Sequence, residues 1–180
     1  FLLSKVKTKY CLFTQPDINI QKNSILNLLN IIKKKKDAIF ITPSYSKNLK
    51  EKKLEKIKKI NAACMICDVE KLKKIGFFDE DFFLYWEDIF LMRKINLSKF
   101  KMIQSYRAIA RHPSGASSIS NMKVKFVRDL NFKYGEYLFD LKTKKFRFIK
   151  LLRQLFQNLI IFPLSCLIFN KNVAIKNIAS

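Results

Sequence analysis

Apolar residues recur along the chain with two different spacings. Short continuous apolar runs are typical of buried strands, whereas apolar residues three and four positions apart are typical of helices. The runs predict strands at 10–14, 38–42 and 62–67 and one or two strands over 101–110, and the helical spacing predicts a helix at 24–36. Helices are also expected from Asp68 to Gly76, at 87–97, which opens with two acids, and from residue 121 onward. Because strands alternate with helices through residue 110, the sequence predicts an α/β fold.

Polar residues and glycine predict where two of these helices begin and end. Asn23 or Ser24 can cap the helix 24–36, because their side-chain oxygens accept from the free amides of a first turn. In the same way Asp68 can cap the next helix, and Gly76 suits the residue that follows its end.

Two further segments bear on the domain organisation. Pro43 is expected to stop the strand before it, and the charged segment 49–59 is expected to be a solvated helix or a loop. The composition shifts near residue 120. We therefore predict one α/β domain over 1–120 and a basic, amphipathic helical tail over 121–180.

The chain carries a large positive charge. It has 36 Lys and Arg against 14 Asp and Glu, a formal net charge of +22 in 180 residues. Such a charge favours an anionic partner, which leaves nucleic acid, an anionic membrane surface and a sugar nucleotide open. A second interpretation is an AT-rich genome, since the chain is rich in Lys, Ile, Asn and Phe.

The four cysteines do not form a recognisable metal site. Cys64 and Cys67 have CxxC spacing, but zinc needs further ligands and the chain has a single histidine. The pair also lies in a predicted strand, where residues three apart point to opposite faces. We therefore expect two packed thiols and, from them, a reducing compartment.

Three polar positions next to apolar elements are candidates for chemistry. Asp17 follows a strand, where a carboxylate suits a hard divalent cation, although Pro16-Asp17 is also a plain turn signal. Glu87-Asp88 opens a helix after an aromatic loop; the two acids complement the helix dipole, or one of them is a general base. The single histidine, His112, follows a strand in a loop and is either a ligand or structural.

Four segments together resemble glycosyltransferase family 2, most closely its rhamnosyltransferase-like branch. The segment 76–88, GFFDEDFFLYWED, is similar to the G-G-F-D-E-x-F-F-x-Y-x-E-D pattern of that family. The other three are LFTQPD at 12–17, which resembles the strand and metal-binding turn, AACMI at 62–66, and His112 with Ser117-Ser118.

The resemblance implies an inverting enzyme that moves a sugar from a nucleotide-diphosphate donor to a saccharide or lipid-linked acceptor, in the synthesis of cell-surface polysaccharide. It implies a divalent metal cofactor, manganese or magnesium. The implied roles are Asp88 as general base, Gln15 and Asp17 at the donor diphosphate, Asp17 and His112 as metal ligands, and Cys64, Tyr85, Trp86 and Glu87 at the acceptor.

The chain departs from the family pattern in places. Gln15 stands where Asp or Asn is usual, and Lys94 where Arg is usual. Residues 1–120 would correspond to the acceptor-side half of a GT-A sheet, with the nucleotide-binding half absent. We therefore expect these 180 residues alone to be inactive and poorly stable, with the strands from Tyr10 and Ala38 lacking neighbours.

The tail combines cations with an interrupted apolar run. Residues 145–169 begin basic and become apolar, but Arg153, Gln154 and Pro163 interrupt the run, which argues against a membrane-spanning helix. An amphipathic helix on an anionic leaflet is expected, with the protein peripheral at the cytoplasmic face of the cell membrane. The alternative is a helix that packs on the α/β domain.

Two other functions remain open at this point. A basic nucleic-acid-binding module would explain the charge, but the sequence contains no groove-reading or base-stacking motif, so no nucleic acid is expected as a partner. The chain could also be an inactive fragment of a glycosyltransferase.

Overall fold

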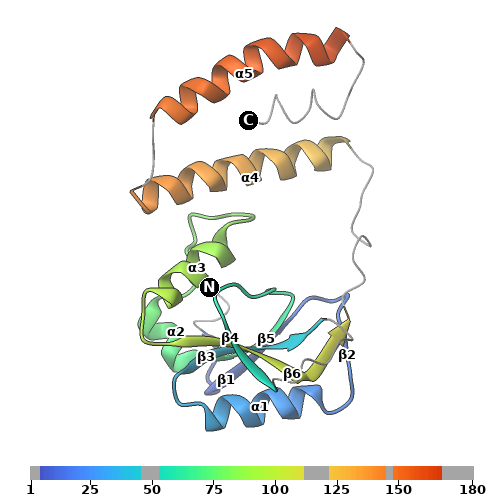
Figure 1. Ribbon diagram of the computed structural model, residues 1–180, viewed down its shortest axis with the longest axis vertical. Coiled ribbons are helices and arrows are strands. Elements are labelled where there is room, and N and C mark those ends of the chain that lie inside the picture. Colours follow the sequence, from blue (N-terminus) through green and yellow to red (C-terminus); the bar gives the residue numbers. More distant parts are fainter. Residues whose placement is uncertain (1–4, 46–52, 112–121, 145–147, 168–180) are drawn as a thin grey trace. The chain divides into compact units, whose positions relative to one another are not determined.

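The computed structural model describes residues 5–45, 53–111, 122–144 and 148–167 (Figure 1). The chain divides into two compact units. The first comprises Phe1–Asp79 and Asp88–Ser117, and the second comprises Glu80–Glu87 and Ser118–Ser180. The loop before Asp88 therefore belongs to the same unit as the tail.

The first unit is built on a mixed six-stranded sheet. Its order is β1 (Tyr10–Thr14), β5 (Cys64–Asp68), β3 (Ala38–Ser44), β6 (Lys101–Arg111) and β2 (Asn19–Ile20), and β4 (Leu54–Ile57) also pairs with β6. Among the strands that the structure describes, β3 and β6 pair in parallel and the other pairs are antiparallel. The expected mixed α/β class is confirmed.

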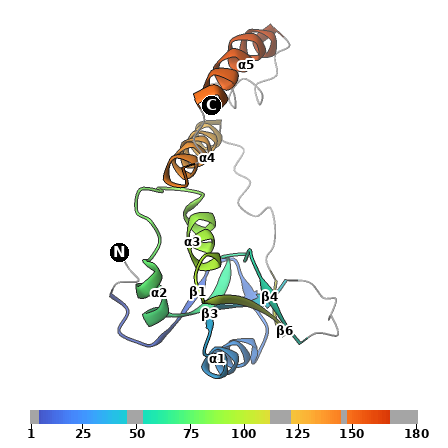
Figure 2. The same ribbon diagram turned by 60° about the vertical axis from the view of Figure 1, so that its left-hand side comes forward.

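Helices cover both faces of this sheet. Helix α1 (Ser24–Lys34) buries Leu28 and Ile32 against Ile41 and Ile66 on one face. On the other face α2 (Val69–Ile75) and α3 (Glu87–Asn96) bury residues that include Leu72, Leu91 and Ile95 (Figures 1 and 2). The sheet is therefore covered on both sides, as apolar strands such as β3 require.

Helix α2 begins and ends as the sequence predicts. The Asp68 carboxylate accepts from the Lys71 amide at 3.1 Å, and Gly76 ends the helix with φ of 78°. The capping prediction for α1 is wrong. Asn23 is left-handed and makes no side-chain cap, and the Ser24 hydroxyl instead bonds the backbone of Ile109. A tertiary partner on β6 has replaced the local one.

Three further expectations are corrected. Strand β3 continues through Pro43, which pairs with Ser105 just before a register shift, and bulges of this kind tolerate proline. The segment 49–59, expected to be a helix or a loop, contains strand β4, because Leu54–Ile57 pairs with β6. The strand from Ala38 lies between β5 and β6 with every residue buried, so it does not lack neighbours.

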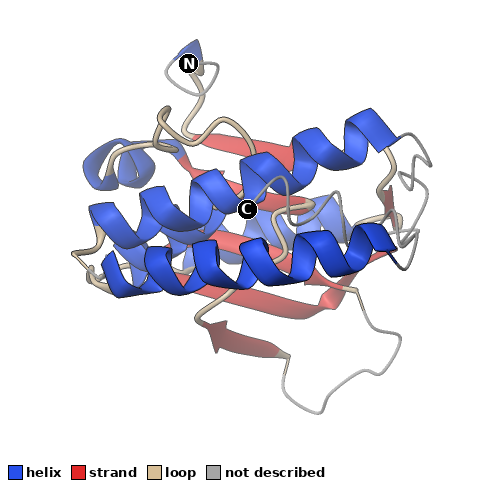
Figure 3. Cartoon of the chain, turned by 90° about the horizontal axis from the view of Figure 1, so that it is seen from above, coloured by secondary structure: helices blue, strands red, loops and turns tan. Residues whose placement is uncertain are grey.

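The second unit contains two long helices, as expected from residue 121 onward. Helices α4 (Met122–Lys142) and α5 (Phe148–Leu167) lie side by side (Figure 3). Lys150 of α5 joins them, because its ammonium lies 2.9 Å from Glu136 and 2.5 Å from Asp140 of α4. In the described ranges, none of the helices has both the length and the hydrophobicity needed to cross a bilayer.

Candidate functional site

The turn after β1 brings Gln15 and Asp17 beside the start of β5. The Gln15 amide donates to the Ala63 carbonyl at 2.8 Å, and the Ile18 amide closes the turn on the Gln15 carbonyl at 3.3 Å. Asp17 is exposed on this turn. Thr14 pairs directly with Cys64, so the structure places three of the predicted site residues, Gln15, Asp17 and Cys64, at one edge of the sheet.

Two hydroxyl groups from β3 and its end hold the backbone of Cys64. Thr42 donates to the Cys64 carbonyl at 2.9 Å and Tyr45 donates to the same oxygen at 3.3 Å. Burial raises the pKa of Tyr45 to about 12, which keeps its hydroxyl protonated as a donor. Sequence reasoning missed Tyr45, although a polar side chain directly after a buried strand was the available signal.

The two cysteines of the CxxC segment are both buried, as expected for packed thiols. Burial raises the pKa of Cys64 and raises that of Cys67 to about 12. Since the thiolate is the nucleophilic form, the raised pKa values disfavour thiol–disulfide chemistry at either side chain at neutral pH.

Strand directions bear on the predicted Asp17–His112 metal site. Strand β1 is antiparallel to β5, β5 is antiparallel to β3, and β3 is parallel to β6, so β1 and β6 run in the same direction. Strand β6 ends at Arg111, which pairs with Asn19, two residues beyond Asp17. His112 itself lies outside the described residues. The carboxyl ends of β1 and β6 therefore lie at the same edge of the sheet. The metal site itself stays a prediction.

The backbone is strained just before the predicted general base. Tyr85 and Trp86 are both left-handed, with φ of 67° and 70°. Bulky residues rarely adopt this conformation, which costs roughly 1–3 kcal/mol for each. Helix α3 begins directly afterwards at Glu87, and the half-buried Asp88 carboxylate accepts from the Ile89 amide at 2.7 Å. One Glu87 carboxylate oxygen is fully buried.

Contacts within the second unit hold these strained aromatics. Trp86 packs on Phe132 and Phe139 of α4, with ring centroids 5.5 and 5.2 Å apart. Arg128 donates to the Tyr85 hydroxyl at 2.7 Å. The Trp86 indole nitrogen is buried, and no hydrogen-bond partner for it is found in the parts of the chain that the structure describes. Strain and an unsatisfied donor at one residue are typical of functional segments.

In the first unit, Lys94 of α3 holds the start of the segment 76–88. Its ammonium donates to the carbonyls of Gly76 and Phe77, each at 3.0 Å. Phe78 then packs against Phe13 of β1 with ring centroids 6.0 Å apart. Lys94 therefore positions the chain at Gly76 and Phe77.

Gly135 of α4 permits the close approach of Trp86. A Cβ atom at this position would lie 2.7 Å from Trp86 Cδ1, which is too short for a real contact. Gly135→Ala is therefore expected to destabilise the second unit by about 1–3 kcal/mol, although alanine in a helix is ordinarily more favourable by about 1 kcal/mol. Urea denaturation measures the change. In a Trp86→Ala background, which removes the two nearest atoms, the same substitution should cost much less, and equal losses in both backgrounds would contradict the contact.

The chain matches none of the protein-family models, curated proteins or solved structures with which it was compared. Any functional assignment therefore rests on the residues and geometry described above.

Proposed function

We propose that this protein is an inverting, metal-dependent glycosyltransferase of the GT-A type, acting on a nucleotide-diphosphate sugar and a saccharide or lipid-linked acceptor. The observation that carries the proposal is the strained Tyr85-Trp86 pair directly before the two acids that open α3. Strain of this kind persists where the surrounding structure over-determines it, and it clusters at active sites. The family-like sequence at 76–88 coincides with this strained segment.

The proposed reaction needs a base and an electrophile in one step. Asp88 accepts the proton of an acceptor hydroxyl while that oxygen forms a bond to the anomeric carbon of the donor. The bond from that carbon to the diphosphate oxygen breaks, and the nucleoside diphosphate leaves with the electron pair. A single attack from the opposite side inverts the anomeric centre, and general-base assistance contributes typically about 10²–10⁴-fold.

Asp17 is the described residue best suited to hold the metal. It is an exposed carboxylate on a turn at the strand edge, which fits the oxygen ligands that Mg²⁺ and Mn²⁺ prefer. Gln15 begins the same turn and is proposed to contact the donor phosphates, and His112 is proposed as a further ligand. A bound divalent ion would offset the charge that builds on the departing diphosphate.

The metal role of Asp17 is tested by binding rather than by turnover alone. In the full-length protein, Asp17→Ala should weaken Mn²⁺ binding and metal-dependent binding of the sugar nucleotide together, each by about tenfold or more. Electron paramagnetic resonance follows the metal, and calorimetry follows the donor. Glu70→Ala, which removes an exposed acid from the first turn of α2, is the matched control. Equal effects of the two substitutions would remove Asp17 from the site.

We also propose that α5 docks on an anionic membrane. Large apolar side chains on α5 form one exposed stripe with helical spacing. The most exposed of them, Ile149, is 73% exposed. The stripe comprises Phe148, Ile149, Leu152, Leu155, Phe156, Leu159 and Ile160. With the net charge of +22, this stripe has the chemistry of an interfacial helix. Such docking would bring a lipid-linked acceptor to the protein.

The cations expected to hold the tail on the membrane are partly engaged elsewhere. Lys142 forms an ion pair with Asp81 at 2.5 Å, and Lys150 is paired with Glu136 and Asp140. Lys145 and Arg147, which the sequence also favoured, lie outside the described residues. Lys144 and Arg153 are exposed and keep the proposed electrostatic contribution to docking beside the apolar stripe.

A further inference from the structure

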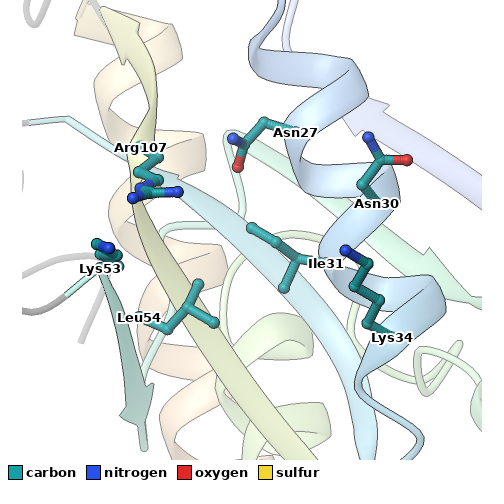
Figure 4. A pocket seen from close by; sticks show the side chains of 7 residues that line it. All are labelled: Asn27, Asn30, Ile31, Lys34, Lys53, Leu54 and Arg107. Carbon is teal, nitrogen blue, oxygen red and sulfur yellow. The ribbon is translucent and has the colours of Figure 1, made fainter.

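A hollow lies on the α1 face of the sheet, between α1 and the neighbouring strands β4 and β6 (Figure 4). Its volume is about 260 Å³. Helix α1 contributes Asn27, Asn30, Ile31 and Lys34, and the strand side contributes Lys53, Leu54 and Arg107.

The polar side chains that line this hollow are cations and amides. Lys34, Lys53 and Arg107 supply three positive charges, and no carboxylate is found among the described residues that line it. A second hollow near α2 differs, because Asp68 and Glu70 line it beside the lysines and Lys71 is already paired with Asp68 at 2.9 Å. Three exposed cations that line one concave surface favour an anionic ligand.

Backbone and side-chain hydrogen bonds position this lining. The Asn27 Oδ1 atom accepts from the fully buried Ser105 hydroxyl at 3.3 Å, so the amide NH₂ group of Asn27 is directed away from that bond. The Lys53 carbonyl accepts from the Tyr106 amide at 3.1 Å, and Leu54 pairs with Ser105. The Lys53 backbone is thus held beside Tyr106, the residue that precedes Arg107 in β6.

The apolar part of the lining adds a second requirement for the ligand. Ile31 and Leu54 are half-buried side chains that also pack against the core beneath α1. They offer apolar surface beside the three cations. A ligand with an anionic group and an apolar portion would match both parts of the hollow.

We propose that this hollow is a binding site for the phosphate or diphosphate group of a phosphorylated ligand. Tetrahedral phosphate oxygens accept from several donors at once, and an arginine fork with two amides and two lysines supplies them. Helix α3, whose first turn contains Asp88, packs on the opposite face of the sheet from α1. The phosphate site is therefore distinct from the proposed transfer site and does not depend on it.

Titration with inorganic pyrophosphate in metal-free buffer, followed by calorimetry at constant ionic strength, tests this site apart from the metal-dependent donor site proposed at Gln15 and Asp17. The protein should bind one equivalent, and the triple variant Lys34→Ala, Lys53→Ala, Arg107→Ala should bind at least about tenfold more weakly, because hydrogen bonds to charged groups are lost. The matched control, Lys58→Ala, Lys59→Ala, Lys73→Ala, removes the same charge from exposed positions outside the hollow. Its affinity should stay within about twofold, since separated surface charges are screened.

A filling variant separates the hollow from general attraction. Asn30→Trp keeps all three cations and places a bulky side chain at an exposed position on the rim, so it should weaken pyrophosphate binding as much as the triple variant does. No binding by the unaltered protein, equal losses in the control, or full binding by Asn30→Trp would each overturn the proposal. Under the same metal-free conditions Asp17→Ala, at the proposed donor site, should leave pyrophosphate affinity unchanged, which distinguishes failure of this site from failure of the proposed transferase.

A second experiment, on vesicle binding, decides whether the phosphate belongs to a lipid headgroup or to a soluble molecule. Vesicles of phosphatidylcholine with and without phosphatidic acid present the same group as a lipid headgroup. If the triple variant and Asn30→Trp lose vesicle binding in proportion to pyrophosphate binding, the site takes a lipid headgroup. If they lose pyrophosphate binding alone, the ligand is a soluble phosphorylated molecule.

Discussion

Replacing Asp88 by asparagine is expected to reduce sugar transfer by about 10²–10⁴-fold while leaving donor binding nearly unchanged. Asparagine keeps the size of the side chain and can still accept from the Ile89 amide. It cannot take the proton of an acceptor hydroxyl, so only the chemical step should suffer. Steady-state kinetics on the full-length protein, with donor affinity measured separately by calorimetry, provide the comparison.

Glu70 provides a matched control for the substitution of Asp88. Glu70 is an acid in the first turn of α2, as Asp88 is in the first turn of α3. If Asp88 only complements the helix dipole, Asp88→Asn and Glu70→Gln should each cost about 0.3–1 kcal/mol of stability and should leave turnover alike. A loss of turnover confined to Asp88→Asn supports the base; near-normal turnover in that variant excludes it.

The second large effect is expected from the apolar stripe of α5. The triple variant Leu155→Ser, Phe156→Ser, Leu159→Ser should bind anionic vesicles roughly a hundredfold more weakly, because each large apolar side chain contributes about 1.5–3 kcal/mol when fully buried and a part of that at an interface. These three side chains are 51–71% exposed, so their loss removes little packing within the protein. Vesicle sedimentation measures the binding.

The control for the stripe removes similar apolar surface from the first unit. Ile25→Ser, Leu26→Ser, Leu97→Ser changes three exposed apolar side chains and should leave vesicle binding near that of the unaltered protein. Binding should also fall with salt and be weaker on neutral vesicles, since the leaflet charge acts within a Debye length. Undiminished binding by the α5 variant would exclude the stripe as the membrane-docking surface.

Local sequence signals were sufficient for the elements whose stability is decided within a few residues. Helix α2 has the Asp68 cap and the Gly76 terminus that the sequence predicted, and α3 begins at the acidic pair. Strand β1 was predicted residue for residue, because a short apolar run bounded by Pro16 is unambiguous. The turn that bears Asp17 was visible for the same reason.

The tertiary structure decided whatever depends on distant partners. The charged segment 54–57 became a strand because β6 supplied backbone hydrogen bonds, and Ser24 left its expected capping role for Ile109, which is 85 residues away. Spacing along the chain contains no record of such pairings, so the strand order and the shared direction of β1 and β6 could not be read from it.

The candidate site divides in the same way. Residue type and position next to apolar elements made Asp17 and Asp88 candidates, and the resemblance of segment 76–88 added Trp86. The left-handed strain at Tyr85-Trp86, the space that Gly135 leaves for the indole, and the cationic hollow beside α1 depend on segments far apart in the sequence. Backbone strain and concave surfaces arise only when such segments pack together, which is why folding alone decides them.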